Sequence, residues 1–148
     1  MARPSSFRPF CPDQVFPGND VHGGFGTHLR VPSRGLCEVP DLSDPKHNPH
    51  GLELSTLSVI ADAVTTPYQA VQRSHLGDGD LAIFVGVGGV DGFGVQIAAA
   101  LGATVAAIDV DSSRLERVAK HGAALVMSPT EVDFRTMKKH LAKFARCF

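Results

Sequence analysis

Glycines crowd one short stretch of the sequence, AIFVGVGGVDGFGVQ at residues 82–96. Gly86 and Gly88 begin the pattern G-x-G-x-x-G directly after an apolar run typical of a buried strand and before a helical pattern, which is the context that this motif requires. Gly86 permits a tight turn, and Gly88 lets the backbone approach a pyrophosphate whose charge faces the N-terminus of the next helix. These residues therefore indicate phosphate binding by backbone N–H groups.

Asp91 occupies the third glycine position of this pattern. A glycine there lets the helix lie close on the strand, whereas Asp91 adds a side chain at a packing contact and a negative charge near a phosphate. At about 5 Å and an effective dielectric constant near 20, that charge costs on the order of 3 kcal/mol, about a hundredfold in affinity. Two alternatives stay open: a shifted pattern that uses Gly92, and a glycine-rich turn that binds no ligand.

An acidic residue follows at the expected place. Asp109 ends the second predicted strand, 23 residues after Gly86, where a carboxylate binds the adenosine ribose hydroxyls and repels a 2′-phosphate. The sequence thus predicts a dinucleotide site that prefers NAD to NADP. Arg114 either reaches the same ribose or is a solvated charge on its helix.

The segments that hold these residues alternate between strand and helix. We expect strands at 81–87, 104–110 and 123–128, a helix over 94–103 that ends at Gly102, and a helix from Ser112, its N-cap, to Gly122. A last amphipathic helix within 130–148 has Met137, Leu141, Phe144 and Phe148 on one face and a basic face elsewhere, which is either solvated or meets a membrane or an acidic partner. This order predicts an α/β fold with a parallel sheet and right-handed crossovers.

The sequence before this alternation is different. Residues 1–52 hold eight of the ten prolines and predict loops with short extended pieces at 25–32 and 35–40. Residues 52–64 and 66–76 are helical in pattern, with Thr65 or Thr66 as N-cap and Pro67 in the first turn, and the sequence GDGD at 77–80 closes the second helix.

Composition limits the function classes. The 148 residues carry a net charge of -1 with 20% charged residues, which gives no footprint for nucleic acid over the whole chain. No apolar run is long enough for a membrane span or a secretory signal. Cys11, Cys37 and Cys147 form no Cys-x-x-Cys pair, the seven histidines form no spaced metal pair on a predicted helix, and a reducing, cytoplasmic location fits best.

Three strands make only half of a doubly wound sheet, because the complete fold has a second half on the other side of its first strand. The half sheet exposes the edge of the first strand, built from Leu81, Ile83, Phe84 and Val85, and such a bare apolar edge favours association. The sequence therefore looks truncated at its C-terminus.

The chain resembles the medium-chain, zinc-dependent alcohol dehydrogenase family over about residues 11–128. The pieces that carry the resemblance are GGFGTHLRVP, ADAVTTPYQA, GDGDLAIFVGVGGVDGFGVQIAAALGA and VAAIDVD. The longer pieces PGNDVHGGFGTHLRVPSRGLCEVPD and LSVIADAVTTPYQA resemble in particular those members that oxidise an alicyclic hydroxyacyl-CoA with NAD.

The resemblance implies a partial doubly wound Rossmann sheet at 53–148, the first half only, preceded at 1–52 by a β and loop remnant of a GroES-like catalytic domain. It places Thr66 near the nicotinamide, and Asp109 with Arg114 on the adenosine ribose. The cofactor-binding turn would be Gly86, Gly88, Gly89 and Val90. Asp62 falls at a catalytic zinc-ligand position, and Cys11 matches the last of four structural-zinc cysteines whose partners are missing.

The sequence differs from the family pattern at positions that the family needs for catalysis. The segment with the Cys and Gly-His-Glu zinc ligands is absent, so zinc is not expected to be retained and the chain alone is expected to be inactive even if it binds NAD. The expected partner is a small molecule, a hydroxyacyl-CoA or another secondary alcohol, and the intact family is expected to form homo-oligomers. Two alternatives remain: an inactive nucleotide-binding or interaction module, and a zinc-less relative similar to quinone reductases.

Overall fold

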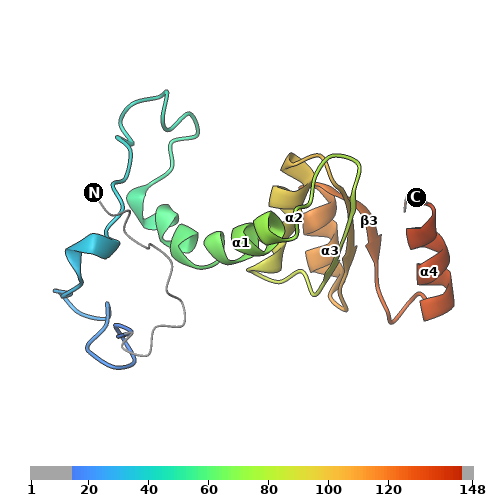
Figure 1. The fold of residues 1–148 in the computed structure, drawn as a ribbon, viewed down its shortest axis with the longest axis horizontal. Coiled ribbons are helices and arrows are strands. Elements are labelled where there is room, and N and C mark those ends of the chain that lie inside the picture. The colour runs from blue at the N-terminus through green and yellow to red at the C-terminus, as the bar shows by residue number, and fades with distance from the viewer. Residues whose placement is uncertain (1–14, 145–148) are drawn as a thin grey trace.

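A parallel sheet forms in the C-terminal half of the chain in the computed structural model, which describes residues 15–144 (Figure 1). Its strands are β1 (Leu81–Val85), β2 (Thr104–Ile108) and β3 (Ala123–Met127), and they lie in the order β1-β2-β3. Helix α2 (Asp91–Ala100) connects β1 to β2, and helix α3 (Ser112–Ala119) connects β2 to β3. The predicted α/β class with alternating strands and helices is confirmed.

The register of the sheet aligns the carboxyl ends of the strands. Leu81 lies opposite Thr104, and Val85 lies opposite Ile108, which in turn lies opposite Met127. The pairing of β2 with β3 shifts once, between Val105 and Ala106. The loops that follow β1 and β2 therefore leave the sheet at the same end, the carboxyl end of the strands. This is where parallel α/β sheets bind their ligands.

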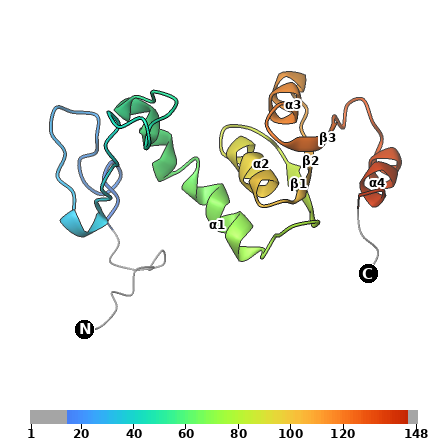
Figure 2. The same cartoon turned by 90° about the horizontal axis from the view of Figure 1, so that it is seen from above.

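Two helices cover one face of the sheet. Helix α2 contacts β1 and β2, and α3 contacts β2 and β3, around a core in which Val95 and Val105 are completely buried. Helix α1 (Thr65–Arg73) packs against α2, whereas α4 (Phe134–Ala142) lies beyond β3 in both views (Figures 1 and 2). Gly102 and Gly122 have φ angles of +88° and +115°, so each supplies the left-handed residue that follows a helix, close to where the sequence predicts the helix ends.

Both predicted N-caps are wrong. Asp111, not Ser112, caps α3, since its carboxylate accepts the backbone N–H groups of Ser113 and Arg114. Val64, not Thr65 or Thr66, precedes α1 and already has a helical backbone. The threonine hydroxyls instead donate backward, Thr65 to the Ala61 carbonyl and Thr66 to the Asp62 carboxylate, because the chain enters α1 directly from a preceding helical turn. Pro67 lies in the first turn of α1, as predicted.

The region before α1 has less regular structure than the sequence suggests. Within residues 15–52, the extended pieces at 25–32 and 35–40 form no strand, and only a single bridge between Pro17 and Val21 is present. These pieces have no neighbouring strand to bond, and an isolated strand is not stable. Short 3₁₀ helices occur at Ser33–Gly35 and Leu54–Ala61, so the first predicted helix is present but is not an α-helix.

Some predictions fall outside the described residues, namely those on Cys11, Cys147 and Phe148. Cys37 is exposed and unpaired with another cysteine. None of the helices within residues 15–144 is both long and apolar enough to cross a bilayer.

Candidate functional site

The glycine turn leaves β1 at the carboxyl edge of the sheet. Gly86 has a φ of +84°, which L-residues with a side chain rarely adopt, and its N–H donates to the Ile108 carbonyl at 2.8 Å. The buried Val87 then anchors the turn in the core, and Gly88, Gly89 and Val90 lead into α2. The turn is therefore tied both to the neighbouring strand and to the hydrophobic core.

Asp109 holds this turn in place through its carboxylate. The side chain is only 4% exposed, its Oδ2 accepts the Val87 N–H at 2.7 Å, and its Oδ1 accepts the Asp111 N–H at 2.9 Å. Hydrogen bonds from the N–H groups of Asp111 and Val87, with the nearby Arg114 cation adding a smaller effect, lower the pKa of Asp109 below its ordinary value. Asp109 thus stays charged at the junction of β1 and β2.

Arg114 lies over the glycine turn between two carboxylates. Its Nη1 is 3.7 Å from Asp109 Oδ2, and its Nε is 3.4 Å from Asp111 Oδ2. A Cβ built on Gly88 would lie 3.9 Å from the same Nη1. The structure brings Gly88, Asp109 and Arg114 together as the sequence suggests, and it adds Asp111. Asp111 was missed, although an Asp directly before a helical pattern is a preferred N-cap.

The surface of the turn has room for a ligand. A Cβ on Gly89 would meet no atom within 4 Å, and a Cβ on Gly88 would meet only the Arg114 guanidinium at van der Waals distance. Neither glycine is therefore required by packing inside the chain. Two adjacent glycines with open space above them, at the start of a helix, form a cradle that fits a pyrophosphate group.

Asp91 is the first residue of α2 and is exposed. No side chain caps this helix by a hydrogen bond. Asp91 is the acidic residue in its first turn, where a negative charge interacts favourably with the helix dipole. The expectation that a side chain at this position disturbs the packing of helix on strand is wrong. The close approach falls on Gly94, where a Cβ would lie 2.7 Å from Phe84 Cε1 and 3.1 Å from Pro67 Cβ.

The shifted pattern with Gly92 does not describe that contact either. A Cβ on Gly92 would meet nothing nearer than the Val87 carbonyl oxygen at 3.8 Å. The sequence does contain a signal for Gly94, because Gly94, Val95 and Ala98 are the buried residues of α2 and share one helical face.

Asp62 and Thr66 form a separate pair at the entrance to α1. The Thr66 hydroxyl donates to Asp62 Oδ1 at 2.8 Å, and both residues are exposed. No group of three or more His, Cys, Asp or Glu side chains that could hold a metal occurs among residues 15–144. One carboxylate does not make a zinc site, so the donor set of the described residues does not fit a catalytic zinc.

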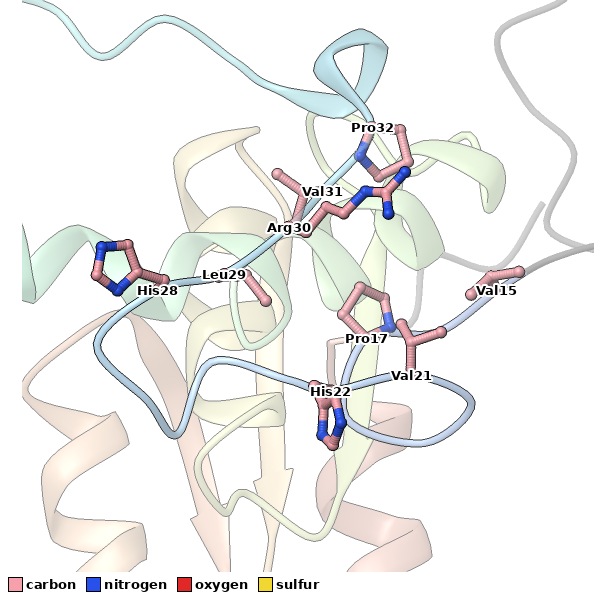
Figure 3. Close-up of a pocket in the computed structure, with 9 residues that line it drawn as sticks. All are labelled: Val15, Pro17, Val21, His22, His28, Leu29, Arg30, Val31 and Pro32. Atoms are coloured by element: carbon pink, nitrogen blue, oxygen red, sulfur yellow. The ribbon is translucent and has the colours of Figure 1, made fainter.

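Hollows occur beside the glycine turn and, separately, within the loops before α1. One, of about 230 Å³, adjoins the glycine turn and lies between α2 and α3, where Gln96, Arg117 and His121 line it together with Gly88 and Gly89. The other, of about 810 Å³, lies within the loops of residues 15–32 (Figure 3). Its described lining, which includes His22, His28 and Arg30, contains no carboxylate, so it offers no acid–base pair.

The open parallel sheet, the glycine turn and the buried acid at the end of β2 define a Rossmann-type nucleotide-binding fold. Comparison with known proteins agrees. The chain is 26% identical to an alcohol dehydrogenase of Geobacillus stearothermophilus over 83% of its length, and 29% identical to an NAD-dependent alcohol dehydrogenase of Sulfolobus acidocaldarius over 88%. The crystal structure of the alcohol dehydrogenase from Aeropyrum pernix superposes with a TM-score of 0.75 at 27% identity over 90% of this chain and 38% of that one. No family model matches the sequence.

The similarity covers only part of each relative. The chain spans about a third of the two curated relatives, 34% and 35% of their lengths. The comparisons therefore support the fold and show a similarity to one part of several alcohol dehydrogenases.

Proposed function

We propose that this chain is the coenzyme-binding part of an NAD-dependent alcohol oxidoreductase. The observation that carries the proposal is the bond from the Val87 N–H to the buried Asp109 carboxylate, which fixes the glycine turn beneath the open surface of Gly88 and Gly89. The similarity to alcohol dehydrogenases supports the same conclusion.

The proposal gives each residue a task. Gly86, Gly88, Gly89 and Val90 would hold the pyrophosphate by backbone N–H groups, while Asp109 and Arg114 would hold the adenosine ribose. Because Asp109 already accepts two N–H groups and lies near Arg114, its oxygens are oriented before a ligand arrives. Bound NAD supplies the hydride acceptor for alcohol oxidation.

The discrimination between NAD and NADP follows from charge. A 2′-phosphate near the ribose position would face the carboxylates of Asp109 and Asp111, and the Arg114 cation between them is already paired with both. We therefore expect NADH to bind more tightly than NADPH.

Titration of the full chain with NADH, followed by cofactor fluorescence, tests the proposal. We expect saturable micromolar binding that is weaker with NADPH, and no binding up to millimolar NADH would refute it. The variant Gly88→Ala should weaken binding without unfolding the chain, because a Cβ there occupies the surface proposed for the pyrophosphate and meets only Arg114 Nη1, at 3.9 Å. Gly24→Ala is the matched control, since a Cβ on Gly24 meets no atom within 4 Å and lies far along the chain from the turn.

A second candidate is a nucleotide-binding module without catalysis. The observation that favours it is the Asp62 carboxylate, which bonds to Thr66 and has no group of further metal ligands around it within the described residues. Under this proposal the chain binds NADH but does not reduce NAD when secondary alcohols are added. Thr66 would still lie near the nicotinamide, and a zinc-less relative similar to quinone reductases would share this arrangement.

The finer proposal concerns the substrate. The sequence pieces at 17–41 and 57–70 are similar to 6-hydroxycyclohex-1-ene-1-carbonyl-CoA dehydrogenase, which makes an alicyclic hydroxyacyl-CoA the first substrate to assay. Residues 1–52 would then be the remnant of a GroES-like catalytic domain, and residues 53–148 the first half of the Rossmann domain.

A further inference from the structure

The hollow between α2 and α3 has walls that come from one continuous stretch of the chain. All of its described lining lies within residues 87–121, and its apolar part, Val87 and Val118, belongs to the hydrophobic core. The turn after α3 is in close contact with α2, since a Cβ on Gly122 would lie 2.6 Å from Ala99 Cβ. The walls of this hollow are therefore built by α2, α3 and the glycine turn themselves.

Two basic side chains line the hollow without a partner. Arg117 lies in the last turn of α3, and His121 follows four residues later. Neither side chain forms an ion pair or a hydrogen bond with any described residue. Arg114 is different, because it lies between the carboxylates of Asp109 and Asp111. The guanidinium of Arg117 is thus available to a ligand.

The opposite wall adds further donors. Gln96 of α2 donates one Nε2 proton to the Gly92 carbonyl at 3.1 Å, which leaves its second Nε2 proton for another acceptor. Gly88 and Gly89 complete the wall without side chains. No acidic side chain belongs to the described lining, so the charged groups of the hollow favour an anion.

We infer that this hollow binds a phosphate monoester group. The Arg117 guanidinium would pair with two phosphate oxygens, as arginine does in bidentate contacts, while His121 and Gln96 donate to the remaining oxygens. A carboxylate has only two oxygens, so a bidentate contact with Arg117 would leave the other two donors without an acceptor. Phosphate therefore matches the set of donors better than a carboxylate does.

The size of the hollow agrees with a single group. Its volume of about 230 Å³ is below the roughly 300–1,000 Å³ of pockets that enclose most of a drug-sized ligand. Arg117 and His121 are exposed, and contacts between exposed charges are weak, so we expect a dissociation constant in the millimolar range.

The phosphate site is separate from the dinucleotide site in its side chains. Asp109 and Arg114 are proposed to hold the adenosine ribose, and neither lines the hollow. The two sites share only Gly88 and Gly89 of the glycine turn. The inference therefore does not rest on dinucleotide binding, and it is tested in the absence of NADH.

Titration of the ¹⁵N-labelled full chain with inorganic phosphate, followed by NMR at constant pH and ionic strength, tests the inference. The side-chain signals of Arg117 Nε and Gln96 Nε2 should shift and saturate. The variant Arg117→Gln should bind phosphate at least about tenfold more weakly, because the bidentate contact is lost. Lys120→Gln is the matched control, since it removes the same charge from an exposed residue directly after α3 that does not line the hollow, and it should bind like wild type.

A second variant and two other anions complete the experiment. His121→Ala should also weaken phosphate binding, and circular dichroism should show both lining variants folded like wild type. Acetate should give no saturable shift. Glycerol 3-phosphate distinguishes the source of the group: tighter binding than inorganic phosphate would assign the site to a phosphorylated metabolite, and weaker binding would assign it to free phosphate.

Several outcomes would overturn the inference. These are the absence of saturable shifts in wild type, equal losses in Arg117→Gln and Lys120→Gln, and binding of acetate as tight as that of phosphate. Phosphate binding that persists in Arg117→Gln, with shifts confined to the glycine turn, would also overturn it and would place the anion on the pyrophosphate cradle instead.

Discussion

Gly94 lies at a close approach of α2 to β1 and α1, and replacing it gives a sharp test of this packing. In Gly94→Ala, the new Cβ would lie 2.7 Å from Phe84 Cε1, 3.4 Å from Phe84 Cζ and 3.1 Å from Pro67 Cβ. Carbon atoms prefer separations of about 3.5–4.0 Å, so both neighbours must move. Proline has a rigid ring, and we expect the overlap to cost about 1–3 kcal/mol.

Gly94→Ala also gains stability, because alanine favours the helix more than glycine does. A second variant, Gly92→Ala, has the same gain and therefore serves as the reference. Alanine is up to about 1 kcal/mol better than glycine inside a helix, and Gly92→Ala gains a similar amount without any contact nearer than 3.8 Å. The difference in unfolding free energy between the two variants therefore isolates the overlap. We expect Gly94→Ala to be about 1–3 kcal/mol less stable than Gly92→Ala.

Urea unfolding followed by circular dichroism measures this difference. Each kcal/mol should also lower Tm by roughly 2–4 °C in a chain of this size. The variant Phe84→Leu removes the two ring atoms that overlap, so Gly94→Ala should cost less in that background. Equal stability of the two alanine variants, or a cost independent of Phe84, would refute the close approach of α2 to β1.

Three further predictions concern the glycine turn. Gly86→Ala should destabilise the chain by about 1–2 kcal/mol in urea unfolding, because alanine at a φ of +84° is strained even though its Cβ meets no atom. Asp91→Asn should bind NADH up to about a hundredfold more tightly in a fluorescence titration, with a smaller gain at high salt, whereas unchanged affinity would mean that this carboxylate does not face the phosphates. The lowered pKa of Asp109 means that the unfolded chain binds more protons, so its contribution to stability is complete above its ordinary pKa of 3.8 and is lost as pH falls below that value. Thermal melting of wild type and Asp109→Asn from about pH 6 to pH 3 should show the smaller fall in the variant.

The alternation of strands and helices could be predicted because each strand is a short apolar run and glycines follow α2 and α3. The position of the Asp109 side chain at the carboxyl end of β2 could also be predicted, because Asp109 directly follows the apolar run that forms this strand. Both features are local, since they depend on residues that are neighbours in the sequence.

Other features depend on contacts between distant segments. Gly94 is the close-packing glycine because Phe84 of β1 and Pro67 of α1 meet there, and no motif spacing contains that information. The N-cap of α3 is different, because it is a local feature: Asp111 accepts N–H groups only two and three residues further along the chain, and the preference for Asp at an N-cap could have indicated it. The extended pieces before residue 52 show the reverse case, in which local β propensity had no partner strand to stabilise it.

The order β1-β2-β3 has a kinetic consequence, since each strand pairs with the strand made just before it. Contacts between segments that are close in sequence close small loops, and proteins rich in such contacts fold quickly. As the chain leaves the ribosome, β1 and β2 can pair before β3 has been synthesised, with α2 already available to cover them. We therefore expect the sheet to assemble in the direction of translation, which limits the time that its apolar strands spend exposed in the nascent chain.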